Sequence, residues 1–296
     1  MNLQHSSRRK VMVLALAAWA SRPATSLAAR PRAAKVPIGI QLWSVRDDCI
    51  KDIDATLKRV AACGFAGVEF AGFYKYEHNA KALRATLDSL GLQAAGAHLS
   101  VRAFQPARLA QTVDFYQTLG CKLLIVGGDR RFTDPEGSKL YAQEMNVAAE
   151  SLKPAGLFCG HHNHKEEFAQ VDNTTYWDLF AQRTSPDVFL QLDIGWVFEA
   201  GLDPVALLER YPNRYKTLHL RGKVAAGVPH KLPIIGKDTL NWPGIIGASL
   251  NGGGAEWLVV EQEEIPTGMT QLSSSRQSLR GLQQILARYS ARQTNR

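Results

Sequence analysis

The feature that most constrains the fold of this chain is an alternation of short apolar runs with longer amphipathic segments. From Val36 onward, eight apolar runs start 26 to 41 residues apart, near Pro37, Ala66, Leu92, Lys122, Leu157, Val188, Tyr215 and Glu256. Each interval has room for one helix and two loops. Short apolar runs bounded by turn residues are typical of buried strands, so the pattern predicts eight successive strand–helix units.

The segments between the runs have apolar residues at helical spacing. Residues 52–62, 79–90 and 106–119 are followed closely by Gly64, Gly91 and Gly120, respectively, as expected where helices end. Further helices are expected over 134–152, 176–181, 204–211, 242–250 and 274–289. Eight alternating units predict one α/β domain over 37–296, a (β/α)₈ TIM barrel. The alternative, a doubly wound open sheet, normally has a glycine-rich phosphate loop after its first strand, and residues 41–46 (QLWSVR) contain no glycine.

The first 28 residues predict an export signal. Paired arginines at 8–9 precede an apolar stretch over 11–20, and residues 26–28 (SLA) offer a signal-peptidase site. The arginine pair resembles a twin-arginine signal, which exports folded proteins. We expect a signal peptide over 1–28, a linker over 29–36 and a periplasmic protein without a membrane span after cleavage. An uncleaved membrane tether or a disordered basic tail is the alternative.

The positive charge of the chain is concentrated at its N-terminus. The formal net charge is +8, but residues 1–35 contain seven basic and no acidic side chains, which leaves 28 basic against 27 acidic groups in the rest. Without residues 1–35 the chain is therefore close to neutral. We expect no nucleic-acid partner, since a polyanion is drawn by a basic surface.

Polar side chains stand at the carboxyl ends of the last four predicted strands: His162, Asp193, His219 and Glu261. The carboxyl ends of barrel strands meet at one face, so these side chains should converge. Two imidazoles and two carboxylates suit Mn²⁺, Zn²⁺, Co²⁺ or Fe²⁺ better than Ca²⁺. The sequence therefore predicts a centre for one divalent metal. Taken singly, each residue has a simpler interpretation: His219 as a core histidine, Asp193 as a helix cap, Glu261 as the partner of a lysine.

The earlier strands supply further polar ends. Gln41 and Trp43 follow the first run, Glu69 ends the second and His98 the third, whereas the fourth ends in glycines at 127–128 that leave room for a ligand. Both Glu69 and His98 could instead bond to loop backbone. These ends are weaker indications of function than the four metal candidates.

Six short motifs in this order resemble the sugar phosphate isomerase/epimerase family. They are residues 40–47 (IQLWSVRD), 67–70 (GVEF), 162–168 (HNHKEEF), 192–196 (LDIGW), 218–220 (LHL) and 259–262 (VVEQ). The resemblance extends from about residue 37 to the C-terminus. It implies a xylose isomerase-like barrel with one divalent metal held at the ends of the last four strands.

The chain departs from the family pattern in two places. Many members have glutamate at the position of His162, and in ketose 3-epimerases that glutamate and the one at Glu261 resemble an acid/base pair. Its replacement leaves Glu261 as the only metal-bound base and argues against a two-carboxylate epimerase. Relatives usually read His-Val-Lys-Asp where residues 219–222 read HLRG, so Arg221 is a candidate contact for substrate oxygens.

We therefore predict a metal-dependent isomerase or epimerase that takes a proton from the carbon beside a carbonyl group. Sugar phosphates are cytoplasmic metabolites, so an exported enzyme should act on an unphosphorylated sugar or keto-sugar. Glu261 and His98 are the candidate proton-transfer groups. The candidate substrate contacts are Gln41, Trp43, Glu69, His164, Glu167, Trp196, Arg221 and Lys237.

Other functions stay open from the sequence. Expulsion of a β-oxygen substituent after proton removal would make the protein a lyase, for example on a 3-keto-glycoside, with a sugar oxidoreductase as functional partner. A non-catalytic sugar-binding barrel is a second alternative. A phosphodiesterase similar to endonuclease IV would need a zinc cluster and a basic DNA groove, which the near-neutral body and the few histidines disfavour.

Overall fold

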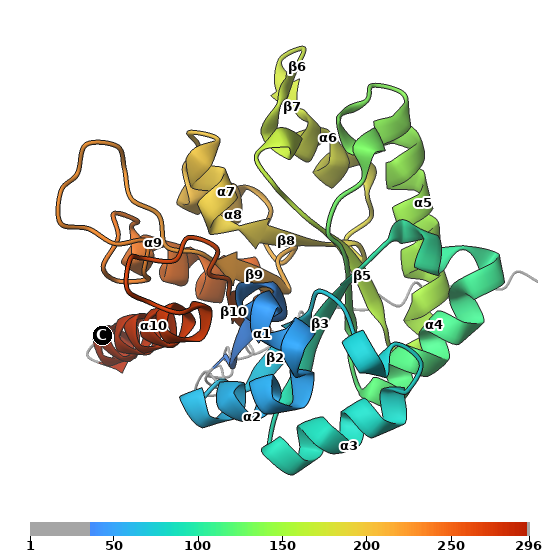
Figure 1. Cartoon of the computed structure of the whole chain (residues 1–296). Helices are drawn as coiled ribbons and strands as arrows, with labels where there is room; N and C mark the ends of the chain where they lie inside the picture. Colours follow the sequence, from blue (N-terminus) through green and yellow to red (C-terminus); the bar gives the residue numbers. More distant parts are fainter. Residues whose placement is uncertain (1–35, 295–296) are drawn as a thin grey trace, which may run out of the picture. The chain divides into compact units, whose positions relative to one another are not determined.

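The computed structural model describes residues 36–294. Eight parallel strands close into one barrel in the spatial order β1-β10-β9-β8-β5-β4-β3-β2 (Figure 1). Their bounds are β1 Ile38–Gln41, β2 Gly67–Phe70, β3 Gln93–Leu99, β4 Leu123–Val126, β5 Phe158–His162, β8 Phe189–Asp193, β9 Thr217–Leu220 and β10 Trp257–Val260. Each strand falls within a predicted apolar run, so the TIM barrel is confirmed. The predicted signal peptide over 1–28 and all but the last residue of the predicted linker lie outside the described residues.

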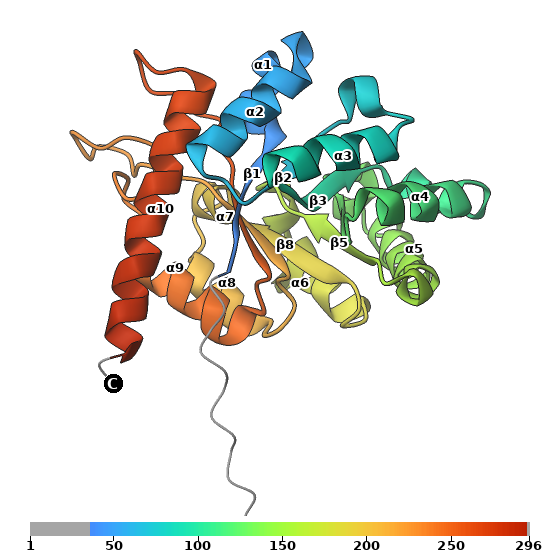
Figure 2. The same ribbon diagram turned by 90° about the horizontal axis from the view of Figure 1, so that it is seen from below.

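Helices surround the barrel (Figure 2). Their bounds are α1 Arg46–Lys51, α2 Ile53–Cys63, α3 Ala80–Leu90, α4 Pro106–Leu119, α5 Gly137–Leu152, α6 Tyr176–Arg183, α7 Ile194–Glu199, α8 Pro204–Arg210, α9 Trp242–Ala248 and α10 Gln271–Thr294. All eight predicted helices are present. The sequence prediction missed α1, α7 and the small hairpin of β6 Gln170–Val171 and β7 Thr174–Thr175, because elements this short carry too few residues to show a periodicity. None of the described helices is long and apolar enough to cross a membrane.

Local capping residues explain where these helices begin and end. The side chain of Asp52 accepts the backbone N–H of Ala55 at the start of α2, and Gly64 ends that helix with a left-handed φ of 94°. Gly120 ends α4 in the same way, with a φ of 75°. These glycines turn the chain back toward the next strand.

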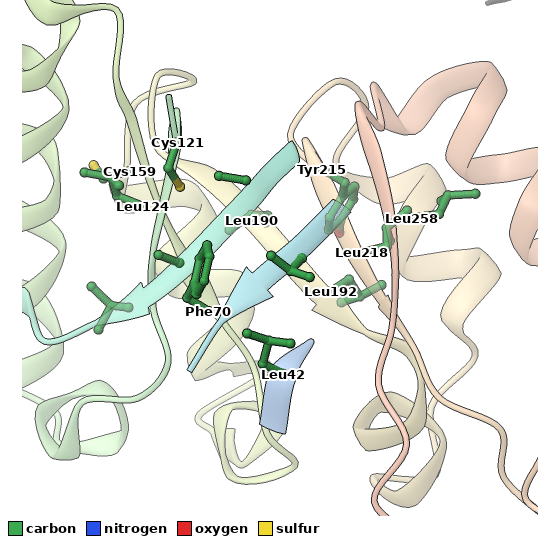
Figure 3. Packing of buried hydrophobic residues seen from close by; sticks show 14 of the residues in the cluster. Leu42, Phe70, Cys121, Leu124, Cys159, Leu190, Leu192, Tyr215, Leu218 and Leu258 are labelled. Atoms are coloured by element: carbon green, nitrogen blue, oxygen red, sulfur yellow. The ribbon is translucent and has the colours of Figure 1, made fainter. Parts of the chain in front are cut away.

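Side chains along each strand alternate between the barrel interior and the layer beneath the helices. In β8, Leu190 and Leu192 belong to the large core cluster shared with the helices (Figure 3). Phe189 belongs to a separate interior cluster. Gln191 and Asp193 follow Phe189 on the interior face. The barrel interior is therefore apolar toward the amino ends of the strands and polar toward their carboxyl ends.

Large rings fill the apolar part of the interior because two strands place glycine beside them. A Cβ added at Gly160 would lie 2.5 Å from the ring of Phe189, and one at Gly67 would lie 2.7 Å from that of Trp257. The two rings form a floor below the polar residues.

A long connection after the seventh barrel strand runs from Arg221 to Asn241, between β9 and α9. Its base is closed by hydrogen bonds: the N–H of Thr239 donates to the carbonyl of Lys223 at 3.1 Å, and the N–H of Lys223 donates to the Asp238 carboxylate at 3.2 Å. The connection therefore begins beside the polar end of the barrel and returns to it.

Candidate metal centre

The barrel brings together the four side chains predicted as metal ligands. His162, Asp193, His219 and Glu261 stand at or just after the carboxyl ends of β5, β8, β9 and β10, and one donor atom from each lies within 4.8 Å of the others. Pairing of β8 with β9 sets Asp193 directly beside His219. All four residues are buried. A second group that could hold a metal shares two of these histidines and adds His98.

His219 is oriented by carboxylates on both sides of its ring. Its Nε2 lies 2.5 Å from Oε1 of Glu69, and its Nδ1 lies 2.9 Å from Oε2 of Glu261 and 3.9 Å from Oδ2 of Asp193. Burial opposes a charge on the ring, but Glu69 and Glu261 raise the pKa of His219 to about 10. A carboxylate behind one imidazole nitrogen, with the other nitrogen facing acidic ligands, is a usual arrangement for a metal-binding histidine.

Glu69 is the centre of a buried hydrogen-bond network. Its carboxylate accepts the side-chain amides of Gln41 and Gln191, both at 2.8 Å, and lies 3.1 Å from Nε2 of His98. Burial alone would raise the pKa of Glu69, but the charges and hydrogen bonds of His219 and His98 hold it well below the usual range. Both oxygens of Glu69 therefore accept hydrogen bonds from other side chains. Glu69 supports the four candidate ligands rather than joining them.

His162 has the protonation state that a metal ligand requires. Burial, followed by the nearby imidazoles of His219, His98 and His164, holds the pKa of His162 well below its ordinary value, so the ring is neutral. Its Nδ1 is buried and has no hydrogen-bond partner among the described residues. A buried, unpaired ring nitrogen of this kind suits coordination. His161 next to it points the other way, against Phe132 and the hydroxyl of Tyr141, so of the two adjacent histidines only His162 joins the group.

Arg221 lies against the two carboxylates of the group. Its Nη2 is 2.9 Å from both Oδ2 of Asp193 and Oε2 of Glu261, and its Nη1 is 2.7 Å from Glu263. Burial raises the pKa of Asp193 to about 6 despite the charge of Arg221. In Glu261 burial acts in the same direction, but His219 and Arg221 outweigh it and lower the pKa.

The residues present fit a divalent cation. They offer a mixed nitrogen and oxygen set, a neutral imidazole with an unpaired nitrogen and a carboxylate that orients the second histidine. Arg221 already donates to two of the four ligands, so a metal would have to compete with its guanidinium.

His98 lies next to the group with its ring orientation determined by Gln191. The amide nitrogen of Gln191 donates to Glu69, which leaves its oxygen 2.8 Å from Nε2 of His98. In the neutral form of this ring the proton is therefore on Nε2 and the lone pair on Nδ1, which lies beside Gly127, where an added Cβ would be 2.9 Å away. Gln191 is not among the site residues predicted from the sequence; the available signal was a polar residue in phase with Asp193 within an apolar strand.

Trp196 and His164 form one side of the polar end of the barrel. The Trp196 ring stacks 4.7 Å from the guanidinium of Arg221, and its centroid is 5.5 Å from that of His164. Glu167 turns away from this side, because its carboxylate accepts the backbone N–H of His164 at 2.8 Å and faces His161. Of these predicted substrate contacts, Glu167 thus supports the segment that carries His164.

Two predicted substrate contacts lie apart from the ligand group. Trp43 is 46% exposed and stacks on Arg46, with 4.7 Å between the guanidinium and the ring. The amine of Lys237 donates to Gln277 of α10 at 2.6 Å. Neither has a described contact with the four candidate ligands.

Known proteins of similar sequence and structure include isomerases, epimerases and dehydratases. The chain is 24% identical over 215 residues to an inosose dehydratase of Clostridium beijerinckii, covering 63% of this chain and 71% of that protein. A sugar phosphate isomerase/epimerase of Parabacteroides distasonis superposes with a TM-score of 0.70 at 25% identity, covering 87% of this chain and 97% of that structure. A probable 3-DHS dehydratase of Bacillus anthracis shares the fold, with a TM-score of 0.61 at 12% identity, over 83% of this chain and 98% of that structure.

The match to a protein family agrees with the barrel and with these relatives. Residues 57–285 match the family described as xylose isomerase-like TIM barrel, which is well over half of the chain. This chain therefore belongs to the xylose isomerase-like TIM barrel family.

Proposed function

We propose that this protein is a metal-dependent lyase that removes a proton beside the carbonyl of an unphosphorylated keto-sugar or keto-cyclitol and then expels an oxygen substituent from the neighbouring carbon. The inosose dehydratases among the similar proteins support elimination over isomerisation. A divalent ion held by His162, Asp193, His219 and Glu261 would supply Lewis-acid polarisation of the substrate carbonyl.

The observation that carries the proposal is the free Nδ1 of His98 next to this group. Because Gln191 engages Nε2–H, the lone pair of Nδ1 is available to accept a proton. Epimerisation needs two acid/base groups on opposite faces of the substrate, and by resemblance to the ketose 3-epimerases residue 162 would be one of them; it is a buried histidine rather than a carboxylate. One base is sufficient for elimination.

The proposed proton and electron movements use no co-reactant. The C–H bond beside the carbonyl breaks, its proton moves to Nδ1 of His98, and the electron pair forms a carbon–carbon double bond as the C–O bond at the next carbon breaks. The departing oxygen takes the proton back from His98 and leaves as water or an alcohol. Glu261, kept ionised by His219 and Arg221, stabilises the positive charge that develops on His98.

The test is incubation of the metal-replete protein in D₂O with a panel of 3-keto-glycosides, inososes and free ketoses. We expect an unsaturated keto product from at least one keto substrate, and a loss of about 100-fold or more in kcat for His98→Asn. His78→Asn, which changes an exposed histidine outside the site, is the matched control and should keep full activity.

Other outcomes would contradict the proposal in distinguishable ways. Deuterium exchange with an epimer or isomer and no unsaturated product would indicate an isomerase. Binding without exchange or product, unchanged in Glu261→Gln, would indicate a sugar-binding protein.

The same proposal includes a location and a source of substrate. With export through residues 1–28, the enzyme would act in the periplasm on the product of a sugar oxidoreductase, since oxidation of a hydroxyl must precede the elimination. Cell fractionation of the full-length chain checks the location; retention of all the protein in the cytoplasm would contradict it.

A further inference from the structure

We propose that Arg221 is the resident counter-cation of this centre, and that a divalent ion binds only by displacing its guanidinium from Asp193 and Glu261. The inference rests on the metal site of the proposed function. It adds a residue that controls the affinity of that site.

The guanidinium engages the oxygens that an ion would need. Oδ2 of Asp193 and Oε2 of Glu261 are the oxygens that face Nδ1 of His219, at 3.9 and 2.9 Å. Nη2 of Arg221 lies 2.9 Å from each of these same two atoms. Its N–H groups therefore point at oxygens through which both carboxylates could coordinate.

The guanidinium and a divalent ion cannot occupy this position together. Coordinated carboxylate oxygens lie about 2.0–2.2 Å from a zinc ion, so an ion bound to both oxygens on the side of Nη2 would overlap the N–H groups that donate to them. Repulsion between a divalent ion and a cation within a few ångströms is strong at a buried site. Arg221 is itself buried, at 2% exposure, so water does not screen it.

The guanidinium also has a contact that does not involve the candidate ligands. Its Nη1 is held by Glu263, whose side chain is 31% exposed. The Nε has no hydrogen-bond partner in the described part of the chain, and the guanidinium stacks on the ring of Trp196 at 4.7 Å. If the hydrogen bonds to Asp193 and Glu261 were lost, the Arg221 side chain would therefore still be held by Glu263.

Because Gly195 has no side chain, Arg221 has room to reach Asp193 and Glu261. A Cβ at Gly195 would lie 2.7 Å from Cδ and 2.9 Å from Cβ of Arg221. Gly195 is in α7 and has no positive φ, so alanine is compatible with its backbone. Gly195→Ala should therefore shift Arg221 from the carboxylates while all charges stay in place.

The test is calorimetric titration of Mn²⁺ into chelator-treated full-length protein. We expect Arg221→Met and Gly195→Ala to bind Mn²⁺ at least about tenfold more tightly than wild type, because each removes the competitor by a different route. Lys223→Met is the matched control: it removes a neighbouring cation, but Lys223 pairs with Glu199 and Glu264 rather than with the ligands. Its Kd should stay within about threefold of wild type, as expected for a charge that lies outside the ligand contacts.

Folding of each variant is checked by far-UV circular dichroism before titration. Arg221→Met leaves two buried carboxylates without their counter-cation and can fail to fold. Gly195→Ala keeps that charge, so it tests the inference by itself.

The outcomes separate the inference from the metal site itself. If the wild type binds Mn²⁺ and the folded variants bind it no more tightly, Arg221 does not compete and the inference is wrong. An equal gain in Lys223→Met would also overturn it, because the effect would then come from net charge. If wild type and variants all fail to bind Mn²⁺, Zn²⁺ and Co²⁺, the proposed metal site is wrong as well.

Discussion

At the residue scale, buried charge in this barrel is organised around Glu69. Its two oxygens accept or face nitrogens of Gln41, Gln191, His219 and His98, which come from four different strands. Such a carboxylate is stable in the interior only because every donor is in place. One side chain thereby sets the orientation of both a candidate ligand and the candidate base.

Glu69→Gln should destabilise the protein and disorder the site. An amide replaces one acceptor oxygen with an N–H₂ group that faces other donors, and His219 loses its counter-charge. We expect the free energy of unfolding to fall by about 3 kcal/mol, measured by urea titration with chelator present. Glu136→Gln, at an 80% exposed side chain paired with Lys139, should change it by less than about 0.5 kcal/mol. If the two substitutions changed the free energy of unfolding equally, the network around Glu69 would contribute no more to stability than an exposed ion pair.

Burial of the Asp238 carboxyl group predicts that the stability of the protein depends on pH. Burial raises its pKa from 3.8 to about 6, although it accepts hydrogen bonds from Trp242 and Lys223. A pKa above that of the unfolded chain means that its contribution to stability is complete below about pH 4 and falls as the pH rises through 6. Asp238→Asn cannot titrate, so its stability relative to wild type should improve by about 2 kcal/mol between pH 4 and 7. A pH-independent difference in urea titrations would contradict this expectation.

At the element scale, α10 holds the connection over 221–241 in place. A Cβ at Gly281 of α10 would lie 1.8 Å from the carbonyl oxygen of Ile235. One turn earlier, Ser278 receives the N–H of Ile235 at 3.3 Å and donates to Gln262 at 2.7 Å. Because Gln262 follows Glu261, this helix links the connection to the end of β10. The segment that contains Arg221 and Lys223 is thus supported from outside the barrel.

Gly281→Ala should separate α10 from the connection. We expect a loss of at least about 2 kcal/mol in stability, since the added methyl group overlaps rigid backbone rather than a flexible side chain. Gly247→Ala in α9 is the matched control: its nearest neighbour would be the Tyr289 ring at 3.7 Å, and it should be neutral or stabilising by up to about 1 kcal/mol. Thermal unfolding of the two variants side by side provides the comparison. A stable Gly281→Ala would contradict the tight packing.

At the scale of the whole barrel, closure depends on its first strand. β1 pairs with β10 on one side and β2 on the other, and Ile40 is fully buried between Val260 and Val68 of those strands. Residues near opposite ends of the sequence therefore share one sheet. Such long-range pairing makes it difficult for part of the barrel to unfold alone.

Ile40→Ala should destabilise the whole barrel without adding an intermediate. We expect a loss of about 3 kcal/mol, with tryptophan fluorescence and far-UV circular dichroism following the same urea transition. Ile50→Ala removes the same atoms at a position that is 72% exposed and should cost less than about 0.5 kcal/mol. Separate transitions for the two probes would mean that the barrel does not unfold as one unit.

The strand and helix order could be predicted from sequence because its determinants are local. Apolar runs, helical spacing and glycines such as Gly64 act within a few residues, and they identified all eight strands and the helix of each unit. The convergence of the four candidate ligands also followed, since all strand ends in a barrel meet at one face.

Tertiary structure alone decided how these residues are engaged. Glu69 is enclosed by donors 28 to 150 residues away in sequence, and Arg221 reaches carboxylates 28 and 40 residues distant. The same long-range packing places the amine of Lys237 within hydrogen-bonding distance of Gln277 in α10. A residue type and its position in a strand limit what a side chain can do, but its partners depend on barrel closure and register, which bring distant segments within hydrogen-bonding distance.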